Sequence, residues 1–370
     1  MQLPFTASSK TQPSDPVAAS VNWRQLPEFD NHEFVIALTD EPSGLSAFIA
    51  VHSRALGFAH GGTRFKTYTS ETEALQDVLN LSKAMSYKSA LAGLPYGGAK
   101  AVIILDESAD RRAVLKAFAQ KVATLGGLFH TGTDVGLVDD DIRYMHQFCS
   151  YMLGVTHNDA DELTTGKAAA IGVYYAIKAA AKHEYGSDDL AGKTVGIKGL
   201  GKLGGELARL LSADKVKLVV ADIDPAVAES YQQMLPDVTI VDPSEIHKQQ
   251  LDIYAPCALG QEFTELSVTE LNCKIIAGGA NNQLSNDMVG DMVAARGIIY
   301  VPDYIANAGG LIFVSEELES DGFKVDRIQQ RLHAISDTVT AVLDEAAATN
   351  QPPYLVATRH AETKIKKATV

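Results

Sequence analysis

One stretch of this 370-residue chain, KTVGIKGLGKLGGELARLL, restricts its fold more than any other. Gly199, Gly201 and Gly204 form a GxGxxG pattern within it. The β-branched residues 194–197 predict a strand before the glycines, and residues 206–211 predict a helix after them. A chain that passes from strand to helix across three glycines is typical of a βαβ unit, in which helices cover a parallel sheet.

The glycines also predict what this turn binds. The first two turn the chain and admit a pyrophosphate, the third lets the helix pack on the strand, and the helix N-terminus favours the phosphate charge. The next strand, KLVVAD, ends in Asp222, about 20 residues further on. A carboxylate there accepts hydrogen bonds from the adenosine ribose and repels a 2′-phosphate. We therefore expect NAD rather than NADP; the simpler alternative is a glycine turn beside a solvated aspartate.

Short apolar segments alternate with helical or loop segments through the rest of the chain. After the glycine turn, strands are predicted at KLVVAD, VTIV, LDIYAPC, CKIIAG and GIIYVPD. The N-terminal half predicts strands at HEFVIALTD and LSAFIAVHS, helices at 71–91 and 111–125, and a loop at LFHTGTDVGL. The sequence predicts an α/β protein of two domains separated by a cleft. Its parts are a flexible tail at 1–20, a first domain at 21–165 completed by 335–370, and a Rossmann-type NAD-binding domain at 166–334.

The overall composition excludes several classes of function. A net charge of −14 argues against a nucleic-acid partner, and contents of 46% hydrophobic and 21% charged residues are those of a soluble globular protein. No apolar run approaches the roughly 20 residues that cross a bilayer, and the N-terminus resembles no secretion signal. Cys149, Cys257 and Cys273 form no CxxC or Cys/His cluster. We expect a cytoplasmic protein with no membrane partner and no metal.

Two lysines and an aspartate are the candidate catalytic residues. Lys100 lies in LPYGGAKAVIIL, between a bend of small residues and an apolar strand. Partial desolvation lowers the pKa of a lysine, and a second cation nearby, Lys88, acts in the same direction, so Lys100 would be a usable general base. A surface lysine whose stem lies on apolar neighbours is the simpler alternative for either residue. Asp134, in TGTDVG, is either a turn residue or a proton carrier.

Several ordered stretches resemble one family. They are GGTRF, MSYKSALAGLPYGGAKAVI, TGTDVG, GVYYAIKAA, GLGKLGGEL, VVADID, APCALG, AGGANNQL and RGIIYVPDYIANAGGLIFV. They resemble the leucine/phenylalanine/valine dehydrogenases of the glutamate dehydrogenase superfamily, and the leucine dehydrogenases most of all. The family interconverts an L-amino acid with its 2-oxo acid and ammonium, using NAD. The resemblance implies an N-terminal substrate and oligomerisation domain and a homo-oligomer of two to eight chains.

The resemblance also implies residue roles. Lys88 would bind the substrate carboxylate with the backbone of Gly61 and Gly62, Lys100 would activate water, and Asp134 would carry protons. The implied cofactor contacts are Gly199, Gly201, Lys202, Leu203, Gly204, Asp222, Ile223, Cys257, Ala258 and Asn281, the last of which would anchor the nicotinamide and the substrate between the domains. One departure is Ala169, which stands where relatives carry a threonine near the nicotinamide. Either Thr164 or Thr165 replaces that contact, or it is lost.

By family position, four residues line the side-chain pocket: His60, Met85, Leu311 and Val314. None of them is a cation for a second carboxylate, and burying an unpaired charge costs several kcal/mol, so apolar substrates are favoured over glutamate. Leu311 favours leucine, valine and isoleucine. His60 leaves phenylalanine and tryptophan open, through stacking or an indole contact, or is a wall residue that selects nothing. A third alternative, motivated by Ala169, is an NAD-binding relative with weakened catalysis.

Overall fold

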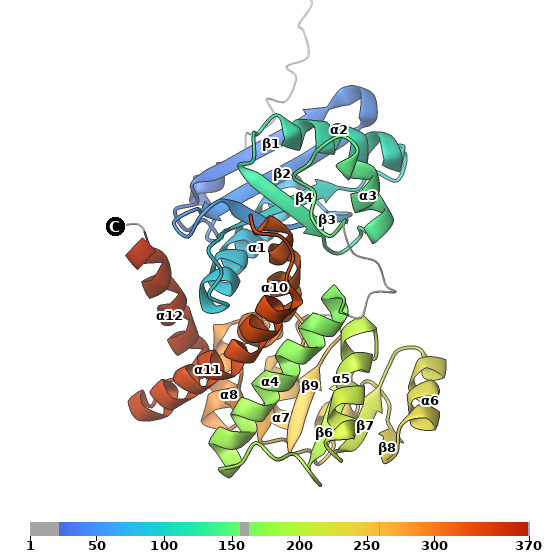
Figure 1. The fold of residues 1–370 in the computed structure, drawn as a ribbon, viewed down its shortest axis with the longest axis vertical. Coiled ribbons are helices and arrows are strands. Elements are labelled where there is room, and N and C mark those ends of the chain that lie inside the picture. The colour runs from blue at the N-terminus through green and yellow to red at the C-terminus, as the bar shows by residue number, and fades with distance from the viewer. Residues whose placement is uncertain (1–21, 156–162, 259, 369–370) are drawn as a thin grey trace, which may run out of the picture.

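The computed structural model describes residues 22–155, 163–258 and 260–368, which form two α/β lobes (Figure 1). The first lobe contains a five-stranded sheet of order β1-β2-β4-β3-β5. Its strands are β1 (Phe34–Asp40), β2 (Leu45–Ser53), β3 (Ala59–Lys66), β4 (Gly97–Ile104) and β5 (Phe129–Thr133). β2 is antiparallel to β1 and β4, whereas β3 is parallel to both β4 and β5.

Helices cover both faces of this first sheet. The helix α1 (Glu71–Leu91) begins at Ser70, whose side chain accepts a hydrogen bond from the Glu73 N–H. Phe48, Ala50 and Val102 pack on the α1 side of the sheet. The residues between them along β2 and β4 pack instead with α2 (Arg111–Ala123) in a separate core. Because side chains alternate along a strand, Lys100 shares the α1 side with Val102.

The second lobe contains a six-stranded parallel sheet of order β11-β10-β9-β6-β7-β8. Its strands are β6 (Thr194–Lys198), β7 (Lys217–Ala221), β8 (Val238–Ile240), β9 (Ile253–Pro256), β10 (Ile275–Ile276) and β11 (Ile299–Tyr300). The strand order reverses beside β6, which is the doubly wound arrangement of a Rossmann fold. Its helices are α4 (Thr165–Tyr185), α5 (Lys202–Ala213), α6 (Pro225–Met234), α7 (Glu265–Glu270), α8 (Asp287–Ala295), α9 (Asp303–Ala306) and α10 (Gly309–Ser315).

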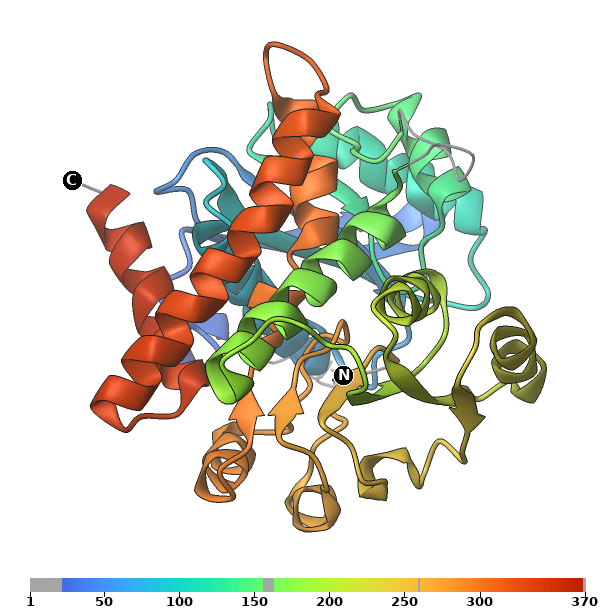
Figure 2. The same ribbon diagram turned by 60° about the horizontal axis from the view of Figure 1, so that its bottom comes forward.

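The C-terminal helices contact both lobes. The long helix α11 (Val325–Thr349) packs along α4, as Figure 2 shows, and ends at Asn350 in a left-handed conformation. The chain then reverses into α12 (Pro353–Ala368), which packs against α1 of the first lobe. The Tyr87 hydroxyl donates to the Glu362 carboxylate at 3.1 Å, and the Lys364 ammonium donates to the Ala90 carbonyl at 3.1 Å. The end of the chain therefore joins the two lobes.

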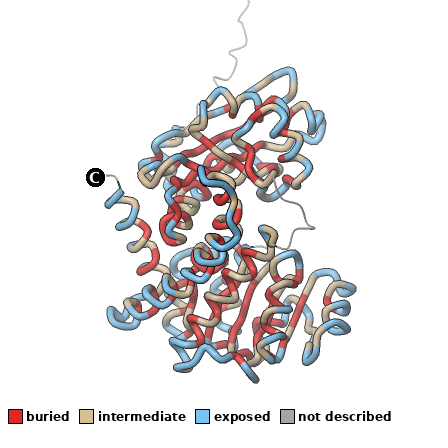
Figure 3. The backbone as a smooth tube through the Cα atoms, in the orientation of Figure 1, coloured by how far each residue is buried: buried red, intermediate tan, exposed pale blue. Residues whose placement is uncertain are grey.

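The buried residues follow the strands of each lobe and the helix surfaces that face them (Figure 3). Most of the predicted strands and helices are present, and the helix predicted at 71–91 has these limits in the structure. One prediction was wrong: the segment interpreted as a loop at LFHTGTDVGL contains β5. The sequence also did not reveal β3, α3 (Asp139–His146) or α12. Strands β3 and β5 carry glycine, threonine and histidine in place of alternating apolar residues, so their pattern is weak.

Candidate active site

The strand register places part of the predicted site on one face of the first sheet. His60 lies beside Gly98 of β4 and beside His130 of β5, and Gly62 lies beside Gly132. Neighbours in register on parallel strands point to the same face, and residues two apart along a strand also do. His60, Gly62 and Lys100 therefore face α1 together, although they are distant in sequence.

Glycines clear space around Lys100. A Cβ added at Gly62 would lie 3.2 Å from the Lys100 ammonium nitrogen and 2.6 Å from the Thr133 carbonyl oxygen. A Cβ at Gly98 would lie 2.1 Å from the Ser86 backbone nitrogen. Any larger residue at these two positions would push α1 or Lys100 away. The small residues before Lys100 therefore let α1 approach the sheet closely.

Lys100 forms an ion pair with Asp134. The Lys100 ammonium lies 2.8 Å from the Asp134 carboxylate, and Lys100 is only 8% exposed. The Arg64 guanidinium contacts the same carboxylate oxygen at 3.3 Å and also pairs with Asp77 at 2.9 Å. Burial alone would raise the pKa of Asp134, but Lys100 and Arg64 outweigh it and hold that pKa well below its usual range. Asp134 is therefore an ionised acceptor between two cations.

Lys88 reaches across from α1 to the second lobe. Its ammonium donates to the Asn281 side-chain oxygen at 3.3 Å, and Asn307 donates to the same oxygen at 2.8 Å. Burial lowers the pKa of Lys88 to about 8, against the attraction of Asp303 and Asp134 and with the help of Lys100. A lysine in this state keeps a positive charge near neutral pH without a carboxylate in direct contact, so it can receive one from a ligand.

These residues line one cavity of about 270 Å³ between the lobes. The predicted residues that it brings together are His60, Gly61, Gly62, Met85, Lys88, Lys100, Asp134, Leu203, Asn281, Leu311 and Val314. Ala169 and Thr165 also line it, whereas the Thr164 side chain caps the start of α4. Of the two threonines, Thr165 is therefore the one that lines the cavity beside Ala169.

The glycine turn lies outside that cavity, at the carboxyl end of β6. Gly199 has a φ of +91°, and a Cβ at Gly204 would lie 1.9 Å from the Gly199 carbonyl oxygen. At Gly201, by contrast, an added Cβ would meet nothing within 4 Å. The first and third glycines therefore serve the turn and the helix packing, while the second leaves an open approach to the N-terminus of α5.

The other predicted cofactor residues surround this turn. The Asp222 carboxylate accepts a hydrogen bond from the Leu200 N–H at 2.7 Å, which ties the end of β7 to the glycine turn. Ile223 is 94% exposed, so a flat apolar ring can lie against it. Ala258 contacts Gly199, and burial raises the pKa of the Cys257 thiol to about 12. These features fit an adenosine and a pyrophosphate, and Cys257 is not a thiolate there.

The second and third glycines make a matched test of this fit. Gly201→Ala should fold with an unchanged Tm but bind NAD at least about 10-fold more weakly, because the methyl group enters the pyrophosphate path. Gly204→Ala should lose about 1–3 kcal/mol of stability, because its methyl group collides with backbone. Calorimetric melting and NAD titration separate the two effects. Tight NAD binding by a folded Gly201→Ala variant would contradict this assignment.

Sequence reasoning missed four polar residues at the site. Arg64 orients Asp134, Asp303 lies near Lys88, Asn307 donates to Asn281, and Asp139 lines the cavity. Arg64 and Asn307 lie within the quoted stretches GGTRF and YIANAGG, so the signal was present. The Asp139 carboxylate lies 3.7 Å from the Lys202 ammonium, which links α3 to the start of α5. Among the described residues, no group of three or more His, Cys, Asp or Glu side chains is arranged to hold a metal ion.

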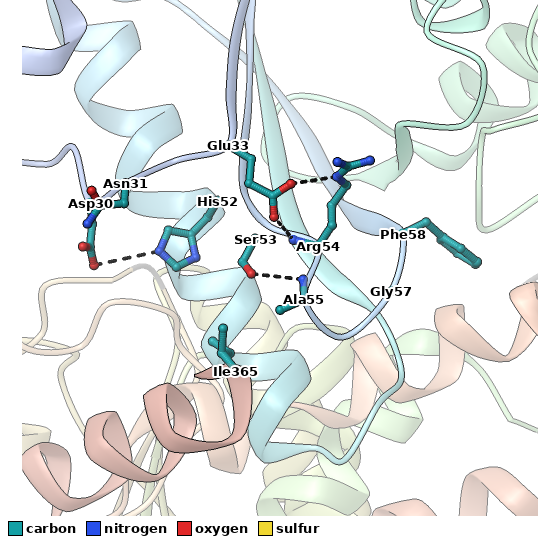
Figure 4. A pocket seen from close by; sticks show the side chains of 10 residues that line it. All are labelled: Asp30, Asn31, Glu33, His52, Ser53, Arg54, Ala55, Gly57, Phe58 and Ile365. Carbon is teal, nitrogen blue, oxygen red and sulfur yellow. Dashed lines mark hydrogen bonds and ion pairs between the residues drawn. The ribbon is translucent and has the colours of Figure 1, made fainter. Parts of the chain in front are cut away.

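A larger pocket, of about 710 Å³, lies elsewhere on the first lobe (Figure 4). Its charged residues pair with one another or with a neighbour: Arg54 with Glu33 at 2.8 Å, and Asp30 with Lys83 at 2.9 Å. Burial lowers the pKa of His52 to about 4, so this histidine is neutral. The pocket shares no lining residue with the cavity at Lys100 and offers no unpaired charge to a ligand.

Comparison with known proteins identifies the family. Residues 32–157 match the Glu/Leu/Phe/Val dehydrogenase dimerisation domain, and residues 224–370 match the Glutamate/Leucine/Phenylalanine/Valine dehydrogenase domain. The chain belongs to this family. The resemblance inferred from the motifs and the predicted α/β fold are both confirmed. Over the part that the structure describes, no helix of this dehydrogenase is long and apolar enough to span a bilayer.

Individual relatives cover nearly all of the dehydrogenase. Leucine dehydrogenase of Bacillus cereus is 40% identical over 342 residues, 92% of each chain, and valine dehydrogenase of Streptomyces albus is 42% identical over 340 residues, 91% of this chain and 93% of that one. The structure of L-tryptophan dehydrogenase from Nostoc punctiforme has a TM-score of 0.80 at 37% identity, and covers 91% of this chain and 97% of that one. The protein is therefore an amino acid dehydrogenase, an oxidoreductase.

Proposed function

We propose that this dehydrogenase catalyses the NAD-dependent, reversible oxidative deamination of apolar L-amino acids to 2-oxo acids and ammonium. The observation that carries the proposal is the single cavity that holds Lys88, Lys100 and Asp134 beside the second lobe. A carboxylate-binding cation, a base and an ionised acid are the groups that this reaction requires. The substrate carboxylate would pair with Lys88, and the backbone of Gly61 and Gly62, which lines the same cavity, would lie against the substrate.

Lys100 and Asp134 would move protons. The Asp134 carboxylate, which lines the same cavity, would accept a proton from the substrate amino group. When bound, NAD supplies the chemistry of accepting a hydride from the substrate α-carbon. Lys100, whose side-chain nitrogen lies 2.8 Å from Asp134, would then take a proton from the water that attacks the resulting iminium carbon, once its own ammonium has lost a proton. Asn281, which contacts Lys88 across the lobes, would hold the substrate and cofactor in register.

Asp222 would select NAD over NADP. Asp222→Ser should raise the KM for NAD about 10-fold, because a charge-assisted hydrogen bond to the ribose is lost, and should improve use of NADP. Asp224→Ser is a matched control, because Asp224 lies two positions after Asp222 and a serine there can still cap α6. The measurement is kcat/KM with each cofactor. An unchanged ratio in Asp222→Ser would mean that another group reads the ribose.

The side chain of the substrate is set by the cavity wall. Met85, Leu311 and Val314 give it an apolar surface, which fits leucine, valine and isoleucine, and the curated relatives act on leucine and valine. His60 is the observation that favours a second candidate, an aromatic substrate, and a solved relative acts on tryptophan. The wall supplies no cation for the second carboxylate of glutamate.

A substrate panel tests the proposal. Purified protein with NAD and an apolar L-amino acid at alkaline pH should form NADH. The rate of NADH formation should be much higher with apolar amino acids than with glutamate. Absence of NADH with every amino acid would leave the weakened, NAD-binding relative as the better account. Preference for glutamate would instead contradict the proposed pocket.

We also propose a homo-oligomer formed through the first lobe, since that part matches a dimerisation domain, and light scattering measures its size.

A further inference from the structure

His60 is a buried polar side chain that the proposed mechanism does not use. It lines the cavity and is 1% exposed, and its Nε2 atom has no hydrogen-bond partner among the described residues. An unpaired polar atom in a protein interior costs about 1–3 kcal/mol, and most buried polar atoms in proteins have a hydrogen-bond partner. The unpaired Nε2 atom of His60 therefore calls for a structural or functional explanation. The other side chains of the predicted pocket wall, Met85, Leu311 and Val314, cannot supply a strong partner.

The position of His60 points to the substrate side chain. His60 lies two residues before Gly62, which adjoins the Lys100 ammonium, and it faces the same side of the sheet. Two residues of a strand advance about 6.6 Å. A substrate bound at Lys100 with its side chain turned towards His60 would therefore need to span about that distance. That distance suits a side chain with a ring rather than one of two or three carbons.

The imidazole is fixed in place and uncharged. Tyr96 packs edge-on against it, with ring centres 5.4 Å apart. The Tyr96 hydroxyl is in turn bonded to Glu319, which pairs with Arg331 at 2.7 Å, so residues of the second lobe secure the ring that supports His60. Burial, with a smaller effect of His130, lowers the pKa of His60 to about 3. A neutral imidazole offers one acceptor nitrogen and one N–H donor.

We propose that His60 determines specificity by accepting a hydrogen bond from an aromatic substrate side chain that carries one N–H or O–H group. This rests on the proposed function and names the substrate class within it. Indole and phenol are the natural side chains that combine a large apolar surface with a single polar hydrogen. Bound to tryptophan or tyrosine, Nε2 gains its missing partner, whereas leucine leaves it unpaired.

Matched substrates isolate this hydrogen bond. Tryptophan and 1-methyltryptophan differ at the indole N–H, and tyrosine and phenylalanine differ at the hydroxyl. We expect the wild-type kcat/KM to favour tryptophan over 1-methyltryptophan about 10- to 100-fold, with the same direction for tyrosine over phenylalanine. In His60→Leu both ratios should fall towards one. His60→Gln, which keeps an acceptor, should retain part of each preference.

The outcomes separate this inference from the proposed function. Oxidation of leucine with equal use of the paired aromatic substrates, or with none of them used, would overturn the role of His60 and leave the dehydrogenase assignment intact. A preference that persists in His60→Leu would also overturn it. Absence of NADH with every amino acid, leucine included, would overturn both. Melting temperatures identify a variant that fails to fold, and His60→Gln then decides the question.

Discussion

Replacing Lys100 by alanine should reduce kcat by about 10²- to 10⁴-fold while NAD binding stays nearly unchanged. The loss follows because Lys100 is the buried amine that lines the cavity, and no other described lysine contacts Asp134. NAD affinity should persist because the glycine turn belongs to the other lobe. Steady-state NADH formation and calorimetric NAD titration give the two quantities.

Two further variants sharpen this result. Lys100→Arg keeps a positive charge for Asp134 but cannot lose its proton, so it should fold normally and stay inactive. Lys182→Ala removes an exposed lysine near the end of α4 and should keep full activity. If Lys100→Arg turned over at more than a tenth of the wild-type rate, Lys100 would be acting as a charge and not as a base.

Asp134→Asn should give the second large effect, on both stability and catalysis. The amide cannot neutralise Lys100 and Arg64, which contact this carboxylate and are largely buried. Breaking a buried ion pair in this way costs about 3–5 kcal/mol, and loss of a proton carrier lowers kcat about 10²- to 10⁴-fold. Denaturant unfolding and NADH formation measure the two losses. Asp139→Asn, which changes a more exposed carboxylate of the same cavity, is the matched comparison.

The stability contributed by the Asp134 ion pair should depend on pH in a definite direction. The pKa of Asp134 is lower in the folded protein than in the unfolded chain, where it is about 3.9. The ion pair therefore contributes stability above that pH, and the contribution disappears as the pH falls towards the folded pKa. The stability difference between wild type and Asp134→Asn should shrink in strong acid. A constant difference from neutral to acidic pH would mean that the carboxylate is not held ionised by its partners.

Local chemistry explains which elements the sequence revealed. The segment at 194–211 combines a β-branched strand, three glycines and an amphipathic helix, and each signal lies within a few residues of the next. Strands β3 and β5 gave no such signal. At Gly61 and Gly62 an added Cβ would collide with the backbone of a neighbouring strand, so the alternating apolar pattern that normally marks a strand is absent there.

The sequence by itself determined the glycine turn, the acid at the end of β7 and the residue types of the predicted site, because these depend on short-range spacing. Only the tertiary structure decided their partners. Lys88 meets Asn281 across 193 positions of sequence, and Asp134 joins Lys100 to Arg64 only because β3, β4 and β5 lie side by side. The unpaired nitrogen of His60 is likewise a fact of packing. No local pattern contains these contacts, since they depend on strand register and on how two separately folded lobes meet.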